Sequence, residues 1–112
     1  EAAADFIKQI TDFIYKEISK SEGIIEAIAD KTCLSTSQLN RKIKAATGMT
    51  TSNFILKIRL NKAAQLLTRT QKPIGEIATS CGFNDFAYFS RTFKKEFHMT
   101  PTSFQRLPHS IN

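Results

Sequence analysis

The segment PIGEIATSCGFNDFAYFSRTFKKEFHMTPTSFQR, residues 73–106, predicts two helices joined by a tight turn. Pro73 suits the first turn of a helix, where its missing N–H costs little. Gly82 is the expected turn residue, and the Asp85 carboxylate is placed to cap a second helix over residues 86–97. A short helix, a turn and an amphipathic helix in this order are the elements of a helix-turn-helix.

A looser copy of this pattern lies upstream, between Ile24 and Phe54. At an offset of 49 residues, Ile25, Ile28, Ala29 and Leu34 match Ile74, Ile77, Ala78 and Phe83. At an offset of 50, Leu39, Arg41, Ile43, Lys44, Met49, Thr50 and Phe54 match Phe89, Arg91, Phe93, Lys94, Met99, Thr100 and Phe104. The change of offset corresponds to one residue inserted in the turn, where insertions are tolerated best. The repeat therefore predicts two helix-turn-helix units.

A helical wheel divides the second helix of each unit into a core side and an outer side. The predicted core arcs consist of Phe86, Phe89, Phe93 and Phe97 in the later copy, and of Thr36, Leu39 and Ile43 in the earlier one. The outer sides carry Ala87, Tyr88, Arg91, Lys94 and Lys95, and Ser37, Gln38, Arg41, Lys44 and Ala45. Arginine can bind guanine edges, small residues let a helix approach the groove floor, and lysine attracts phosphate. This mixture favours DNA recognition, although a helical protein–protein interaction module remains an alternative.

The remaining sequence predicts an all-α protein of seven helices, because no segment alternates as a strand does. We expect helices over residues 3–19, 24–31, 36–47, 51–67, 86–97 and 101–107, and one that begins at Pro73. Ser35 is placed to cap the third helix, and Gly48 suits its left-handed C-terminal position. The expected organisation is a leading helix of the first subdomain (1–22), a first helix-turn-helix (23–50), a linker helix (51–72), a second helix-turn-helix (73–107) and a tail (108–112).

The charge of the chain is concentrated in its middle. The net charge is +6, and residues 23–72 hold nine basic against two acidic side chains. The corresponding numbers are three against five in residues 1–22 and four against three in residues 73–112. A polyanionic partner would therefore meet chiefly the middle of the chain, although a solvated basic face explains the charge equally well.

The sequence lacks the motifs that are typical of membrane proteins, secreted proteins, metal-binding proteins and enzymes. No apolar run approaches the ~18–20 residues that span a bilayer, and the N-terminus lacks the order of a signal peptide. We therefore expect a cytoplasmic location and no membrane contact by this segment. Cys33 and Cys81 are expected to be buried thiols. With only His98 and His109 and no catalytic or phosphate-binding motif, we expect no enzyme, no metal and no cofactor.

The sequence closely resembles the signature of the AraC/XylS transcription regulators. The motifs I-x-x-I-A, G-F-x-D, Y-F-S-R-x-F-K-K and M-T-P stand at Ile74–Ala78, Gly82–Asp85, Tyr88–Lys95 and Met99–Pro101. Upstream, LSTSQLNRKIKAATGMTTSNFI and IRLNKAAQLL resemble the less regular first unit and the linker helix of the family. The wording SQLNRKIKAATGMTT and the leading helix resemble more particularly the C-terminal domain of hybrid two-component regulators.

This resemblance implies two homeodomain-like helix-turn-helix subdomains joined by a long linker helix. Two recognition helices would then enter successive major-groove segments of double-stranded DNA. Carried over from the family, the base-contacting candidates are Ser37, Asn40, Arg41, Phe86, Ala87, Tyr88, Ser90 and Arg91. The backbone-contacting candidates are Thr36, Gln38, Lys42, Lys44, Lys94 and Lys95.

Two departures from the family pattern bear on the rest of the protein. His98 stands where the family has glycine, and a histidine in a left-handed cap costs on the order of 1 kcal/mol. The family's sensing domain is not found in this sequence, which implies a fragment of a longer regulator. We expect the fragment to be monomeric and regard dimerisation of the intact regulator, its contact with RNA polymerase and a membrane anchor as open alternatives.

Overall fold

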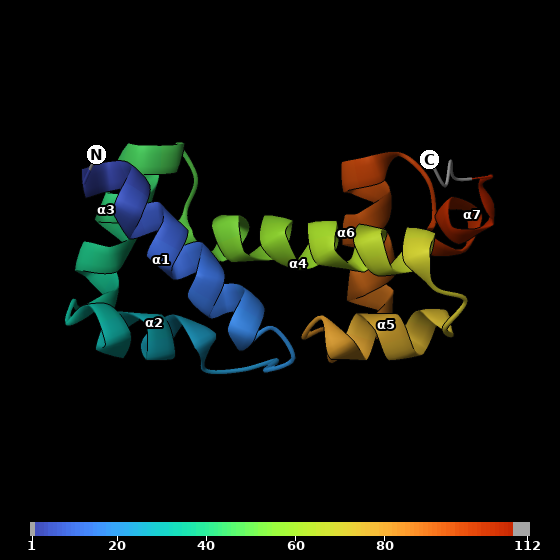
Figure 1. Ribbon diagram of the computed structural model, residues 1–112, viewed down its shortest axis with the longest axis horizontal. Coiled ribbons are helices and arrows are strands. Elements are labelled where there is room, and N and C mark those ends of the chain that lie inside the picture. The colour runs from blue at the N-terminus through green and yellow to red at the C-terminus, as the bar shows by residue number, and fades with distance from the viewer. Residues whose placement is uncertain (1, 109–112) are drawn as a thin grey trace.

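The computed structural model describes residues 2–108, which form seven helices and no strand (Figure 1). The helices are α1 (Ala2–Lys16), α2 (Ile24–Thr32), α3 (Thr36–Thr47), α4 (Thr51–Arg69), α5 (Ile74–Ser80), α6 (Phe86–Phe97) and α7 (Pro101–Arg106). The all-α prediction is therefore confirmed for the described part of the chain. The expected tail lies, apart from Pro108, outside the described residues, as does His109.

Helix α4 runs along the long axis of the molecule and joins two separate hydrophobic cores (Figure 1). The first half of α4 contributes Phe54, Ile55 and Ile58 to a core that it shares with α1, α2 and α3. The second half contributes Leu60, Ala63 and Leu67 to a core that it shares with α5 and α6. Because the two halves of one helix pack into different cores, the molecule consists of two helix-turn-helix subdomains on a common axis.

The repeat seen in the sequence recurs as a repeat of backbone hydrogen bonds. In the first turn, Cys33 N–H donates to Asp30 O at 3.2 Å and Leu34 N–H to Ala29 O at 3.0 Å. In the second, the equivalent donors Gly82 and Phe83 bind Thr79 O and Ala78 O, both at 3.0 Å. The offset of 49 residues is the same for donors and acceptors, so the two turns have the same bonding pattern.

The helix ends also correspond between the two subdomains. Ser35 and Gln38 form a reciprocal capping box at α3, and the Asp85 carboxylate accepts from Tyr88 N–H at α6. Gly48 (φ 79°) and His98 (φ 67°) both adopt the left-handed conformation at the C-terminal ends of these helices. The predicted caps are confirmed, and His98 occupies the strained position that the comparison with Gly48 indicates.

Several predicted boundaries and burials are wrong. α1 ends at Lys16 instead of Ser19, and α4 continues to Arg69. Thr70 is the C-cap of α4, and both its backbone N–H and its hydroxyl donate to Leu66 O. Pro73 is the N-cap of α5 and precedes its first turn. Cys33 is exposed, because it occupies the left-handed turn (φ 59°) on the surface.

Candidate nucleic-acid interface

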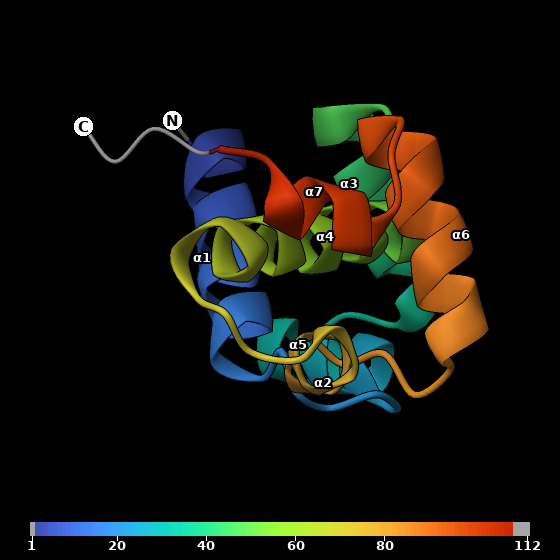
Figure 2. The same cartoon turned by 90° about the vertical axis from the view of Figure 1, so that its right-hand side faces the viewer.

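Helices α3 and α6 lie on the same side of α4, and α1 lies on the other side (Figure 2). Both α3 and α6 run from bottom to top in Figure 1, so their N-termini point the same way. Each is the second helix of a helix-turn-helix, the position that enters the major groove in DNA-binding proteins of this design. The common side and direction are the geometric condition for two such helices to meet one duplex.

The core of the second subdomain holds α6 by a ladder of phenylalanine rings. Phe89 and Phe93 are fully buried, with ring centroids 5.7 Å apart. Phe83 lies 4.8 Å from the Phe89 ring, and Phe104 lies edge-on 5.3 Å from the Phe93 ring. Aromatic pairs at these separations add to the energy of apolar burial. The face opposite this ladder is therefore presented rigidly to solvent.

The prediction that Phe86 and Thr36 belong to the core arcs is wrong. The Phe86 side chain is 53% exposed and Thr36 is also exposed. Both residues stand at the first position of their helix, one turn before its first buried residue. The wheel gives the direction of a side chain but not whether the core reaches that end of the helix. The exposure of Phe86 leaves it accessible as the base-contacting candidate that the family resemblance implies.

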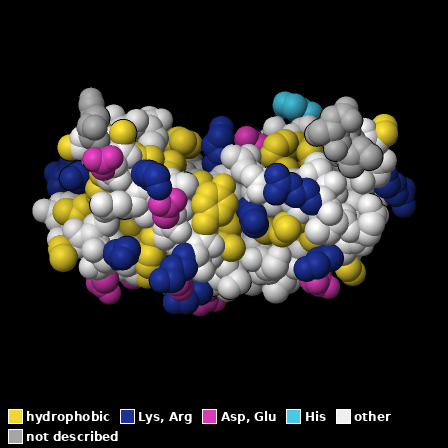
Figure 3. Space-filling view, in the orientation of Figure 1, with side chains coloured by type: hydrophobic (Ala, Val, Ile, Leu, Met, Phe, Trp, Pro, Cys, Tyr) yellow, Lys and Arg dark blue, Asp and Glu magenta, His cyan; other side chains and the backbone are white. Residues whose placement is uncertain are grey.

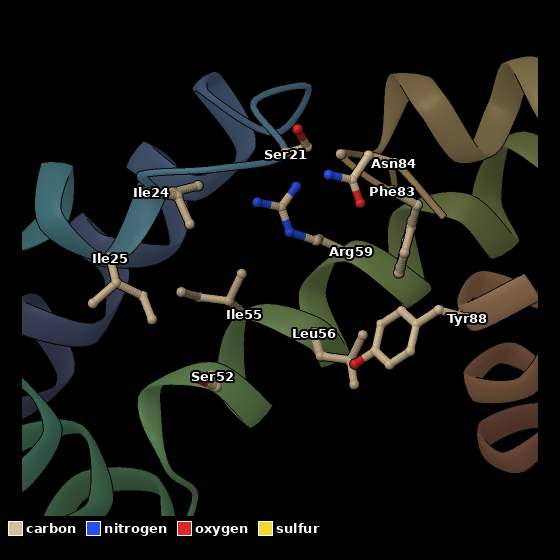
Figure 4. A pocket seen from close by; sticks show the side chains of 11 residues that line it. Ser21, Ile24, Ile25, Ser52, Ile55, Leu56, Arg59, Phe83, Asn84 and Tyr88 are labelled. Atoms are coloured by element: carbon tan, nitrogen blue, oxygen red, sulfur yellow. The ribbon is translucent and has the colours of Figure 1, made fainter. Parts of the chain in front are cut away.

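Most of the remaining candidates on α6 are accessible. Ala87, Arg91, Lys94 and Lys95 are exposed, and Ser90 is half-buried. Tyr88 is 42% exposed, and its ring is directed toward α4 beside Leu56, 6.4 Å from the Phe83 ring (Figure 4). The Tyr88 ring therefore points toward α4, and not away from the protein as the wheel predicts for the outer side of α6.

On α3, three of the predicted contact residues already have partners in the protein. Asn40 Oδ1 accepts from Thr51 N–H at 2.9 Å, so this side chain ties α3 to the start of α4. Gln38 Oε1 accepts from Ser35 N–H in the capping box. The Lys42 ammonium lies 4.5 Å from the Phe6 ring centroid on the α1 side. Ser37, Arg41 and Lys44 are exposed on the outer side, as the wheel predicts.

The charge of the two outer faces is predominantly positive. α3 carries Arg41, Lys42 and Lys44 and contains no acidic residue. α6 carries one acidic residue, Glu96, whose carboxylate lies 3.7 Å from the Lys57 ammonium. Over α1, on the opposite side of the molecule, lysines alternate with acidic groups (Figure 3). Basic side chains therefore outnumber acidic ones on both α3 and α6.

Arg59 is a buried basic residue, whose position a count of charges along the sequence does not reveal. It is 6% exposed, and its guanidinium binds three backbone carbonyls: Nη1 donates to Ile18 O and to Cys81 O, and Nη2 donates to Lys20 O. Burial lowers the pKa of Arg59, although arginine stays charged. A signal was present, since Arg59 lies four residues from both Ile55 and Ala63 and so on the buried stripe of α4.

Other kinds of site receive no support from the described residues. Across residues 2–108, no group of three or more His, Cys, Asp or Glu side chains is arranged to hold a metal ion. None of the described helices is long and apolar enough to cross a bilayer. Burial raises the pKa of the Cys81 thiol, which disfavours the reactive thiolate.

Comparison with known proteins agrees with this geometry. A family model described as a helix-turn-helix domain matches residues 28–107. The transcriptional activator RhaS of Mannheimia succiniciproducens is 39% identical over 101 residues, which are 90% of this chain and 36% of that protein. RhaS of Escherichia coli is 38% identical over 68% of this chain and 27% of its own length. The chain thus spans about a third of the length of these relatives, or less.

Solved structures share the whole arrangement of helices. The C-terminal domain of AraT, a response regulator from Geobacillus stearothermophilus, matches with a TM-score of 0.82 and 32% identity over 96% of this chain and 90% of that one. An AraC-type transcriptional regulator from Chromobacterium violaceum matches with a TM-score of 0.83 and 29% identity, covering 96% and 98% of the two chains. The DNA-binding domain of AdpA, solved with a target DNA, shares the fold at 17% identity and a TM-score of 0.80. The chain belongs to the AraC/XylS family of helix-turn-helix DNA-binding domains.

Proposed function

We propose that this chain binds double-stranded DNA in a sequence-specific manner, as the DNA-binding domain of a transcription regulator. The observation that carries the proposal is the placement of α3 and α6 on one side of α4 with a common direction (Figures 1 and 2), each with more basic than acidic side chains. Two helices so placed can enter successive major-groove segments about 34 Å apart along one face of the duplex. The names of the matched relatives, a transcriptional activator and a response regulator, support the same assignment.

We assign the base-reading roles to exposed side chains on the two helices. Arg41 and Arg91 occupy equivalent positions in the repeat and can each bind the O6 and N7 atoms of a guanine. The apolar Phe86 and Ala87, at the first turn of α6, suit contact with a thymine methyl group. The other base-reading candidates are Ser37, Tyr88 and Ser90, and Asn40 through its amide N–H groups.

The backbone-contacting roles fall on exposed lysines and on the start of α3. Lys44, Lys94 and Lys95 supply positive charge for phosphates, and Thr36 can donate a hydrogen bond from the first position of α3. Gln38 and Lys42 are weaker candidates, because each has a partner inside the protein. For Lys42, the charge still adds to the long-range field of α3.

The alternative is a helical protein–protein interaction module without DNA affinity. The basic face favours DNA over this alternative, since protein interfaces are depleted in lysine. The proposal includes no enzymatic activity, and it implies a cytoplasmic location in a bacterium. Contact with RNA polymerase and dimerisation of a longer regulator are compatible with it.

Selection of bound sequences from a random duplex library tests the proposal. We expect a recovered site with two short blocks about 10 bp apart, one for each recognition helix. Arg41→Ala and Arg91→Ala should each weaken binding to that site by ~1–3 kcal/mol and relax base preference in one block only. Lys16→Ala, a charge removed from α1 on the opposite side, is the matched control and should leave both blocks unchanged. Failure to enrich any sequence, with no affinity for random duplex at low salt, would favour the interaction module.

A further inference from the structure

The Arg59 guanidinium joins segments that belong to both subdomains. Its acceptors Ile18 O and Lys20 O follow α1 in the first subdomain, and Cys81 O follows α5 in the second. The distances from the guanidinium nitrogens to Cys81 O and Lys20 O are both 2.8 Å. Because the guanidinium is a rigid planar fork, three acceptors that bind it together have little freedom to move relative to one another. We call this set of contacts the Arg59 clamp.

The clamp uses backbone carbonyls in place of a carboxylate partner. Ile18 and Lys20 lie just after the last residue of α1, and Cys81 is the C-cap of α5. The Cys81 carbonyl, at the C-terminal end of α5, carries partial negative charge that attracts a cation. Since Arg59 is buried, salt screens these contacts far less than it screens surface ion pairs.

Beyond the clamp, the two subdomains face each other across an open groove. The groove has a volume of about 230 Å³, and side chains from both subdomains line it, among them Ile24, Ile25, Phe83 and Tyr88 (Figure 4). The two hydrophobic cores remain separate clusters on either side of it. Apolar packing across the gap is thus incomplete, and Arg59 is one of the residues that line this groove.

The turn of the second helix-turn-helix is seated directly on the clamp. Gly82, with φ of 91°, lies so close to it that a Cβ atom there would overlap Arg59 Nη1 and Ile18 O. The equivalent turn residue of the first subdomain, Cys33, carries a side chain and is exposed. α6 begins four residues after Gly82, so the position of this recognition helix depends on where the clamp holds the turn.

We propose that Arg59 is a positioning residue that fixes the distance and rotation between α3 and α6, and thereby the spacing of the two DNA blocks that the chain binds. The inference rests on the proposed function. One added base pair moves a block by ~3.4 Å along the duplex axis and turns it by ~35°. A rigid pair of readers accepts one spacing, whereas a hinged pair accepts several and gains less affinity from the best one.

The DNA test changes the spacer of the selected site by one base pair in either direction. We expect the unmodified chain to lose on the order of 100-fold in affinity, because the second helix can no longer engage. Arg59→Met should bind the parent site more weakly and lose less than roughly tenfold when the spacer changes. Arg69→Met removes the same charge from the exposed end of α4 and should keep the full spacing penalty. A folded Arg59→Met variant with an unchanged penalty overturns the proposal.

A second measurement tests the clamp without DNA. Spin labels on the exposed Cys33 and on Thr102→Cys in α7 report the distance between the subdomains, and the buried Cys81 stays unlabelled. We expect a narrow distance distribution in the parent chain and a broader one in Arg59→Met. Equal widths overturn the clamp even if DNA binding stands, whereas broadening in a chain that binds no DNA supports the clamp and refutes the proposed function. If Arg59→Met does not fold, Arg59→Lys replaces it in both the spacer test and the distance measurement, because lysine keeps the charge but not the planar fork.

Discussion

Replacing Gly82 with alanine should destabilise the protein far more than the same change at Gly48. Both glycines have positive φ, 91° at Gly82 and 79° at Gly48, so an alanine is strained at either position. The surroundings differ, because a Cβ at Gly48 meets nothing within 4 Å while one at Gly82 overlaps the Arg59 guanidinium and Ile18 O. The pair therefore separates backbone strain from the loss of the Arg59 clamp.

The expected magnitudes follow from these two terms. Left-handed backbone costs an alanine ~1–2 kcal/mol, which is the whole effect expected at Gly48. At Gly82 the guanidinium must also move, and each hydrogen bond to a charged group is worth ~1.5–3 kcal/mol. Partial loss of the three bonds brings the total for Gly82→Ala to ~4 kcal/mol or more, a large share of the ~5–15 kcal/mol that stabilises a domain.

Urea denaturation followed by far-UV circular dichroism measures the free energy of unfolding of each variant. Gly23→Ala is a second control, since Gly23 also has positive φ (78°) and a Cβ added to it meets nothing within 4 Å. A difference of less than ~1 kcal/mol between Gly82→Ala and the two controls would refute the steric argument. In an Arg59→Met background the extra cost of Gly82→Ala should shrink, because part of the overlap is then removed.

Three further predictions concern the remaining departures from simple expectation. His98→Gly should raise the free energy of unfolding by up to ~1 kcal/mol in the same titration, because glycine relieves the left-handed strain; a destabilised variant would contradict this. Lys44→Ala should reduce the slope of log affinity against log salt by about one unit, whereas Lys42→Ala, whose ammonium lies over an aromatic ring of α1, should change it less. A reduction of about one unit in both variants would show that both lysines contact phosphate. A thiol reagent should modify the exposed Cys33 in the folded protein and Cys81 only on unfolding. Because burial raises the pKa of Cys81, the unfolded thiol ionises first, and the free energy of unfolding should fall as pH rises above about 8.5, with a smaller decrease in Cys81→Ala.

The sequence predicts the helices and their caps well, because these features depend on residues within about four positions of one another. Ser35 caps α3, Asp85 caps α6, and Gly48 and Gly82 have positive φ, as their positions in the repeat indicate. The buried Phe89 and Phe93 follow from helical spacing in the same way. Each of these predictions needs only local geometry.

The sequence is least informative where a helix ends or where a side chain has a partner far along the chain. Phe86 points in the same direction as the core residues of α6 on the wheel. It is exposed because it is the first residue of α6, where the core does not cover it. Asn40 is a base-contacting candidate through the family resemblance, and its amide oxygen accepts a hydrogen bond from the backbone N–H of Thr51, eleven residues away. A wheel contains no information about what stands opposite a face or where a core stops.

From the sequence alone, one can derive two related helix-turn-helix units, their recognition helices and a basic middle segment, since repeat, periodicity and charge are properties of the chain itself. The placement of the two recognition helices relative to each other is decided only in the tertiary structure. The acceptors of Arg59 are 41, 39 and 22 residues away along the chain. They are main-chain carbonyls, which every residue possesses, so no side chain marks them in the sequence. Only the folded backbone brings them to one guanidinium.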